Sequence, residues 1–277
     1  LTLGSAISGT GTLTKNSAGA LVLSGANSYD GANTVNGGTL EIDGISSGTG
    51  ALTTVANTVL AGNGTVNGAV TVGGQMNPGT ASAPGIFNAN SGLTLSSGST
   101  LNFDLSATAP GDPAQNDSTN VLGDLHANNN TITVNFNGTP QSGASYLLFT
   151  YTGTLSGSFN PTVLGTHFAT TLDTSAPGFV YLTVTGGAGS ALEWASLSDT
   201  TWDSITTNWT DLNSGLPSTF SAGDSILLDD SNGVMPSLTL AAGVSVAPSL
   251  ITNDSTNNYF TISGAGSITG GAGIVKT

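Results

Sequence analysis

Apolar and polar residues alternate along this chain in short runs that are separated by glycine and asparagine. In the first third the runs fall at 34–36, 39–42, 65–67, 69–72, 93–95 and 101–105. A period of two places successive side chains on opposite faces of a strand, and glycine-rich corners allow sharp turns between strands. For residues 1–105 this pattern predicts the rungs of a parallel β-solenoid, with a meandering antiparallel sheet as the alternative.

The remaining chain predicts three further regions, all of them β. Residues 106–185 begin with a loop at 106–120 and continue with longer, aromatic-rich strands, which fit either a wider solenoid or a β-sandwich-like region inserted in or appended to it. Residues 186–240 follow a glycine-rich joint and form an acidic region that contains all three tryptophans. Residues 241–277 contain strands that begin another repeat. No segment has a helical period, so the predicted fold class is all-β.

The end of the chain repeats its beginning. Residues 268–277 align without gaps on residues 7–16, and the offset of 261 places Lys276, one of only two Lys or Arg residues, on the other, Lys15. Self-similarity of this kind is typical of arrays whose neighbouring units complete one another. We therefore expect an assembly interface at the two ends, formed at the head by Ile7, Leu13 and Lys15 and at the tail by Ile262, Ile268, Ile274 and Lys276. Both lysines are expected to be exposed at rung corners.

The composition narrows the possible partners. The formal net charge is −14, with 16 acidic residues and two basic ones, so the cationic surface that nucleic acids require is missing. No apolar run is long enough to span a membrane, and the absence of cysteine excludes disulfides and thiolate metal sites. With 40 glycines and only 6% charged residues, the chain is typical of exported bacterial surface proteins.

One segment carries a long ordered pattern. It begins at Lys15 and continues through Leu21-Val22-Leu23-Ser24-Gly25-Ala26-Asn27-Ser28-Tyr29 to Thr34-Val35-Asn36-Gly37-Gly38-Thr39-Leu40. Over residues 9–42 the chain resembles the autotransporter-associated β-strand repeat, also called the passenger-associated transport repeat. The resemblance implies a right-handed parallel β-helix exported to the cell surface. It supplies no catalytic residues.

Candidate chemistry outside this repeat is sparse. Trp194, Trp202 and Trp209 could stack on sugars, although clustered tryptophans more often fill a core or a contact between units. Calcium is the only cofactor considered, with Asp224, Asp229 and Asp230 as weak candidates, because hard cations prefer clustered carboxylates. No arginine is available to bind a uronate, and we expect no enzyme activity.

The sequence therefore predicts a structural module of an extracellular fibre, stalk or surface layer, with copies of itself as partners. A glycan-binding adhesin is the alternative, and a polysaccharide-degrading enzyme is a third hypothesis.

Overall fold

The computed structural model shows an all-β chain. It describes residues 1–80, 83–107, 109–137, 140, 143–164, 169–186, 189–212, 215–269 and 272–277, with the backbone alone at 161–164, 169, 186 and 232. The contacts divide the chain into unit 1, residues 1–166 and 170–183, and unit 2, residues 184–277 with 167–169. Among the described residues the only helix is a 3₁₀ turn, η1 (Ser231–Gly233).

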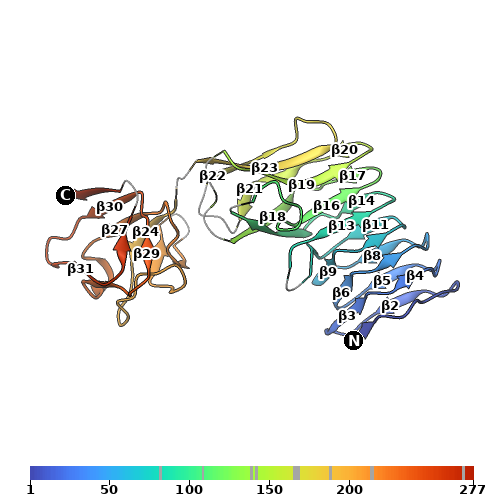
Figure 1. Ribbon diagram of the computed structural model, residues 1–277, viewed down its shortest axis with the longest axis horizontal. Helices are drawn as coiled ribbons and strands as arrows, with labels where there is room; N and C mark the ends of the chain where they lie inside the picture. Colours follow the sequence, from blue (N-terminus) through green and yellow to red (C-terminus); the bar gives the residue numbers. More distant parts are fainter. Residues whose placement is uncertain are drawn as a thin grey trace. The chain divides into compact units, whose positions relative to one another are not determined.

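Unit 1 is a three-sided parallel β-helix whose strands stack in chain order, except that β23 precedes β22 at the end of the second sheet (Figure 1). The first sheet contains β1 (Thr2–Leu3), β3 (Ala20–Leu23), β6 (Gly38–Ile42), β9 (Thr58–Gly62), β12 (Gln75–Pro78), β15 (Thr100–Ser106), β18 (Asn130–Asn137) and β21 (Phe159–Leu164). The second contains β4 (Ala26–Asn27), β7 (Ile45–Ser46), β10 (Thr65–Val66), β13 (Ile86–Ala89), β16 (Ser118–Val121), β19 (Ser145–Tyr151), β23 (Phe179–Gly186) and β22 (Ala169–Asp173). The third contains β2 (Leu13–Lys15), β5 (Asn33–Val35), β8 (Leu52–Thr54), β11 (Val70–Val72), β14 (Leu93–Leu95), β17 (Leu125–His126) and β20 (Leu155–Ser156).

The core of unit 1 consists of apolar residues stacked in register. Leu40, Leu60, Met76, Leu101 and Ile132 occupy one register position on successive strands of the first sheet, and each is 0% exposed. Alternation places their sequence neighbours on the outer face of the sheet. Each buried side chain of this size contributes roughly 1.5–3 kcal/mol, so the column stabilises the stack of rungs. The predicted parallel β-helix is confirmed.

The corners that connect the first sheet of unit 1 to the second become longer along the chain. Between the first and second sheets the first three corners have two residues each (24–25, 43–44 and 63–64), whereas the next three span 79–85, 107–117 and 138–144. The third sheet has no comparable change, since β8, β11 and β14 keep the parallel register. The loop expected at 106–120 is therefore one enlarged corner of a continuing solenoid.

Asp117 ties two of these enlarged corners to the first sheet. Its Oδ1 accepts a hydrogen bond from the Gly85 N–H (2.8 Å) and its Oδ2 accepts one from the Asp104 N–H (2.7 Å). The side chain is 2% exposed. Burial raises the pKa of Asp117 to about 7; the two N–H donors oppose this shift, and the nearby Asp104 carboxylate adds to it.

This raised pKa predicts a specific pH dependence of stability. In the unfolded chain the carboxyl ionises near pH 4, so between about pH 4 and pH 7 the folded state holds a proton that unfolding releases. The free energy of unfolding contributed by Asp117 is therefore highest below pH 4, falls as the pH rises, and levels off above about pH 7. Urea unfolding of the wild type and Asp117→Asn at pH 5 and pH 8 tests this. The wild type should lose more stability than the variant between the two values, and equal losses contradict the assignment.

Unit 1 ends with a change of strand direction. β23 pairs with β19 antiparallel, and β22 lies on the outer side of β23. These two strands end the second sheet, and β23 interrupts the parallel pairing of the rungs. Across the expected boundary at 105/106, β15 and β18 pair in parallel over seven positions, so the described residues of 106–164 agree with the wider-solenoid alternative.

Unit 2 is a smaller parallel β-helix. Its strands are β24 (Ala191–Trp194), β25 (Trp209–Asp211), β26 (Pro217–Ser218), β27 (Ser225–Leu228), β28 (Ser237–Leu240), β29 (Ser245–Val246), β30 (Leu250–Asn253), β31 (Thr261–Gly264), β32 (Ser267–Ile268) and β33 (Gly273–Lys276). Strands β24, β27, β30 and β33 pair in parallel, as do β28 with β31 and β29 with β32, while β25 and β26 add antiparallel strands beside β24. Across the expected boundary at 240/241, β27 and β30 pair in parallel.

Candidate functional site: the ends of the solenoid units

The first turn of unit 1 forms an open end. Strands β1 and β2 each pair on one side only, with β3 and β5, and between them residues 7–9 hydrogen-bond to residues 27–30 of the next turn. Ile7 and Leu13 are half-buried and, with Tyr29, line a cavity of about 110 Å³, while Leu1 is 79% exposed. Unpaired strand edges beside exposed apolar side chains are a template for further strands. Two of the predicted head residues therefore lie at an open edge.

Lys15 is buried at 7% exposure, contrary to the expected corner position on the surface. Its Nζ donates to the Ser17 carbonyl (2.5 Å) and to the Gly37 carbonyl (2.8 Å). The Ser17 and Gly37 carbonyls lie at rung corners, outside the strands, and point toward the end of the Lys15 side chain. The ammonium group therefore supplies hydrogen-bond donors that no neighbouring strand provides. Lys15 therefore links the first turn to the second.

Lys15→Met should destabilise unit 1 by about 2 kcal/mol, because it leaves two carbonyls without their charged donor. Urea unfolding followed by circular dichroism measures the change. Lys276→Met is the matched control, since Lys276 is exposed, and its cost should stay within about 0.5 kcal/mol. Equal costs for the two substitutions would contradict a structural role for Lys15.

The corner around Asn27 explains why the repeat pattern needs its small and amide residues. Asn27 is 0% exposed; its Oδ1 accepts from the Ile7 N–H (3.0 Å) and its Nδ2 donates to the Gly25 carbonyl (3.2 Å). A Cβ on Gly31 would lie 2.0 Å from the Gly11 carbonyl oxygen, so only glycine fits there. Sequence reasoning did not single out Asn27, although its place between Gly25 and Tyr29 in the pattern was the available signal.

The last turn of unit 2 forms a second open end. Strands β31, β32 and β33 pair only with the preceding turn, through β28, β29 and β30. Ile274 is 76% exposed, Val275 42% and Ile268 39%, and Ile262 is half-buried. These apolar residues stand at the edge of a solenoid, where a further rung would cover them.

Two of the three strands in the last turn correspond to strands of the first turn, whereas β32 falls on residues 6–7, which form no strand. At the offset of 261, Ile274 to Lys276 of β33 fall on Leu13 to Lys15, which are the whole of β2, and residues 263–264 of β31 fall on β1. Ile268 in β32 falls on Ile7. The lysines differ in two respects: Lys276 is exposed and donates back to the Ser255 carbonyl (2.8 Å) of the preceding turn, whereas Lys15 is buried and donates forward to the Gly37 carbonyl. The sequence repeat is therefore in part a repeat of structure.

The calcium candidates hold loops rather than a common ligand site. Asp230 accepts from the backbone N–H groups of Thr256, Asn257 and Asn258 (2.7–3.0 Å) and from the Ser255 hydroxyl. The Ser255 hydroxyl, and after it the Asn257 and Thr256 N–H groups, lower the pKa of Asp230. Asp224 accepts from the Ser190 and Ser221 N–H groups, and Asp229 from the Ser231 N–H. Among the described residues, no three His, Cys, Asp or Glu side chains group as a metal site would need. The three candidates are therefore not brought together.

Trp194, Trp202 and Trp209 lie in the core of unit 2 and are at most 1% exposed. Trp209 lies 5.0 Å from Trp194 and 5.6 Å from Trp202, measured between ring centroids in edge-to-face pairs. No ring presents a face to solvent, so the alternative of a sugar-stacking platform on these rings is wrong. They pack the core, as aromatic clusters commonly do.

These features define the class: a chain of two parallel β-helices with exposed edges at the first and last turns. Residues 13–42 match the passenger-associated-transport-repeat family, and the match begins where β2 begins and ends where β6 ends. The chain thus carries a structural repeat of autotransporter passenger domains, a family that implies an extracellular or surface-exposed protein. No curated protein matches the chain. In the part of the chain that the structure describes, no helix has the length and apolar character of a membrane span.

Proposed function

We propose that this chain is a structural module of an extracellular bacterial fibre, stalk or surface layer, in which copies stack head to tail through their open turns. The observation that carries the proposal is the last turn, in which β33 falls on β2 and part of β31 falls on β1, and whose strands are unpaired on their outer side. An edge of this kind is completed by another strand. Because head and tail are different surfaces, the contact is heterologous and continues into a filament unless the rotation closes a ring.

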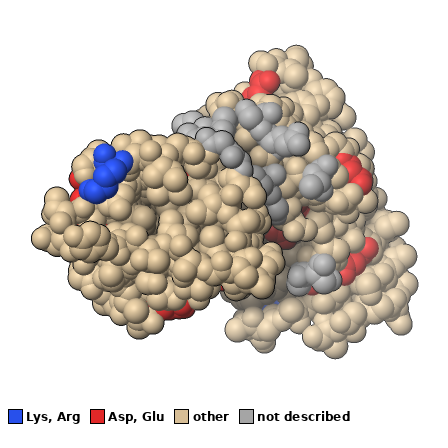
Figure 2. All heavy atoms as spheres, turned by 60° about the vertical axis from the view of Figure 1, so that its left-hand side comes forward, with Lys and Arg blue, Asp and Glu red and all other residues tan. Residues whose placement is uncertain are grey.

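The module acts mechanically and performs no catalysis. Backbone ladders join one rung to the next, and the buried columns resist separation of the rungs. The surface offers few charges: Figure 2 shows small, separate acidic groups on a face that is otherwise mostly uncharged. Asp229 accepts a hydrogen bond from Ser231 in its own loop and Asp230 accepts one from Thr256 in a second loop, which supports a structural role for them.

Sedimentation velocity of the whole chain from micromolar to millimolar concentration tests the assembly. The average mass should rise with concentration without stopping at a dimer. The rise should persist in high salt, because apolar and backbone contacts are screened much less than charge pairs. A single species with the mass of one chain at every concentration contradicts head-to-tail assembly.

A further inference from the structure

The enlarged corners of unit 1 border a polar groove on the outer face of the first sheet. One cavity of about 410 Å³ lies against Pro84 and Gln115, and a second of about 360 Å³ continues toward Glu41 and Asn77. Asp104 and Asn135 line both cavities. The lining comes from β6, β9, β12, β15 and β18, five neighbouring strands, which together extend for about 19 Å at the usual strand spacing. This length suits an extended ligand that lies along the solenoid axis.

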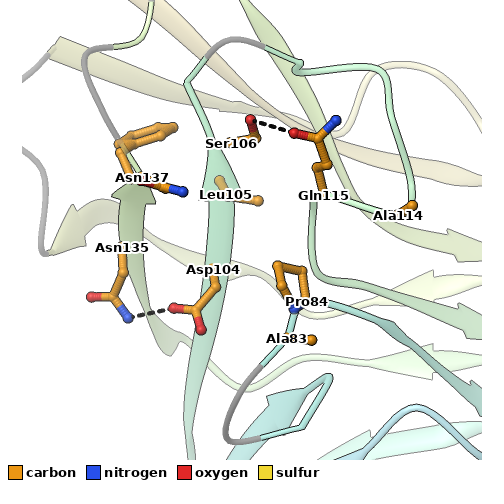
Figure 3. Close-up of a pocket in the computed structure, with 10 residues that line it drawn as sticks. Ala83, Pro84, Asp104, Leu105, Ser106, Ala114, Gln115, Asn135 and Asn137 are labelled. Carbon is orange, nitrogen blue, oxygen red and sulfur yellow. Dashed lines mark hydrogen bonds between the residues drawn. The ribbon is translucent and has the colours of Figure 1, made fainter.

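The groove is lined by amides and carboxylates that repeat from strand to strand. Asn135 Nδ2 donates to Asp104 Oδ1 (2.8 Å) and to Asn102 Oδ1 (3.2 Å). Figure 3 shows Asp104 and Asn135 joined across adjacent strands, with Ala83 and Pro84 opposite Asp104. Side chains of this kind offer donors and acceptors close together, which is the arrangement that neighbouring hydroxyls of a sugar ring require.

The walls of the groove are ordered by hydrogen bonds made before any ligand arrives. Asn116 accepts from the Ser106 N–H (2.7 Å) and donates to the Ala109 and Asp112 carbonyls (2.6 and 2.8 Å). Asp117 holds Gly85 and Asp104 together, as described above. Long loops in a compact solenoid are commonly functional, and walls that are already ordered reduce the entropic cost of binding.

The charges around the groove restrict the ligand. Glu41, Asp104 and Asp117 are acidic, while the two lysines of the chain lie in the first and last turns, where they donate to the Gly37 and Ser255 carbonyls. An anionic ligand such as a uronate or a phosphate would meet carboxylates with no cation to offset them. An extended peptide is bound mainly by strand edges, whereas this groove lies on a sheet face and presents side chains.

We infer that this groove is a binding site for an uncharged oligosaccharide, held by hydrogen bonds that Asp104 accepts on the sheet and that the amides of Asn102, Asn135 and, on the wall, Gln115 donate or accept. It is a function additional to assembly, and it lies on the side of unit 1 rather than at an end. The buried tryptophans of unit 2 take no part in it.

Isothermal titration with defined oligosaccharides of one to six sugars tests the inference. The panel contains neutral hexose, N-acetylhexosamine and uronic acid series. At least one uncharged series should bind, with affinity that rises with chain length, and the uronic acid series should not. Asn135→Ala should weaken binding at least about tenfold, because two or more hydrogen bonds are lost. Gln115→Ala, on the exposed loop wall, should weaken it by a smaller factor.

Asn120→Ala is the matched control. Asn120 belongs to a similar amide ladder on the second sheet, where its Nδ2 donates to Asn88 Oδ1 (3.1 Å), and its substitution should change the affinity less than twofold. Three results would overturn the inference: no binding of any uncharged oligosaccharide, tighter binding of uronic acids, or equal losses for Asn120→Ala and Asn135→Ala. Sedimentation of Asn135→Ala should match the wild type, so a failure of glycan binding is distinguishable from a failure of assembly.

Discussion

Ile274→Lys should raise the concentration needed for assembly at least about 100-fold. Ile274 is 76% exposed on β33, and a following module would bury it. The substitution forfeits roughly 1.5–3 kcal/mol of apolar burial and adds the cost of desolvating an ammonium group, and about 2.7 kcal/mol corresponds to 100-fold. Sedimentation velocity over a concentration series measures the shift. The isolated module should keep its stability, because the side chain is exposed before assembly.

Ile45→Lys is the control for this prediction. Ile45 is 51% exposed, but its strand β7 pairs on both sides, with β4 and β10. The same change of chemistry is thus made on the side of the solenoid, and assembly should be unchanged. If both lysine variants assemble as the wild type does, or if both fail equally, the contact does not involve the β33 end.

Trp202→Ala should reduce the stability of unit 2 by about 3–5 kcal/mol, the usual cost of removing a buried aromatic ring. The Trp202 ring is 0% exposed and packs edge-to-face on Trp209 and on Phe220, at 5.6 and 5.4 Å between centroids. All three tryptophans lie in unit 2, so denaturant unfolding followed by tryptophan fluorescence reports on this unit. The midpoint should move to a much lower denaturant concentration.

A core substitution in unit 1 separates this effect from a general loss of stability. Phe87 is 0% exposed and belongs to β13 of unit 1. Phe87→Ala should lower the stability measured by circular dichroism, yet leave the midpoint of the tryptophan fluorescence transition nearly in place. A cost below about 1 kcal/mol for Trp202→Ala would contradict the placement of this ring at the centre of the core.

Much of the fold follows from local sequence patterns. Alternation with a period of two, interrupted by glycine at the corners, is sufficient to predict the rungs of residues 1–105, because apolar residues occupy the same core positions in every turn. The sequence leaves open whether the solenoid continues through 106–164, because an enlarged corner and a true domain boundary have the same local composition. The antiparallel pairing of β23 with β19 could not be predicted, because strand direction depends on partners that are distant in the sequence.

The end turns could be predicted because they repeat in the sequence. Contacts between residues that are distant in the sequence could not be predicted. Self-similarity indicates the two end turns that contain Ile7, Leu13, Ile268 and Ile274, and the role of these residues in assembly stays a prediction. The burial of Lys15 depends on the carbonyl of Gly37, 22 residues away in the next turn, and no local pattern indicates that contact. Asp104 and Asn135 come together only when β15 and β18 stack, so the groove was not visible in the sequence.

The central claim is that the tail of one module is completed by the head of the next. Electron cryomicroscopy of the wild-type chain at high concentration tests it most directly. Head-to-tail stacking predicts polar filaments with one chain per axial repeat, in which β33 of one copy adjoins the first turn of the following copy. Blunt single molecules, or closed dimers joined by two like ends, would contradict it.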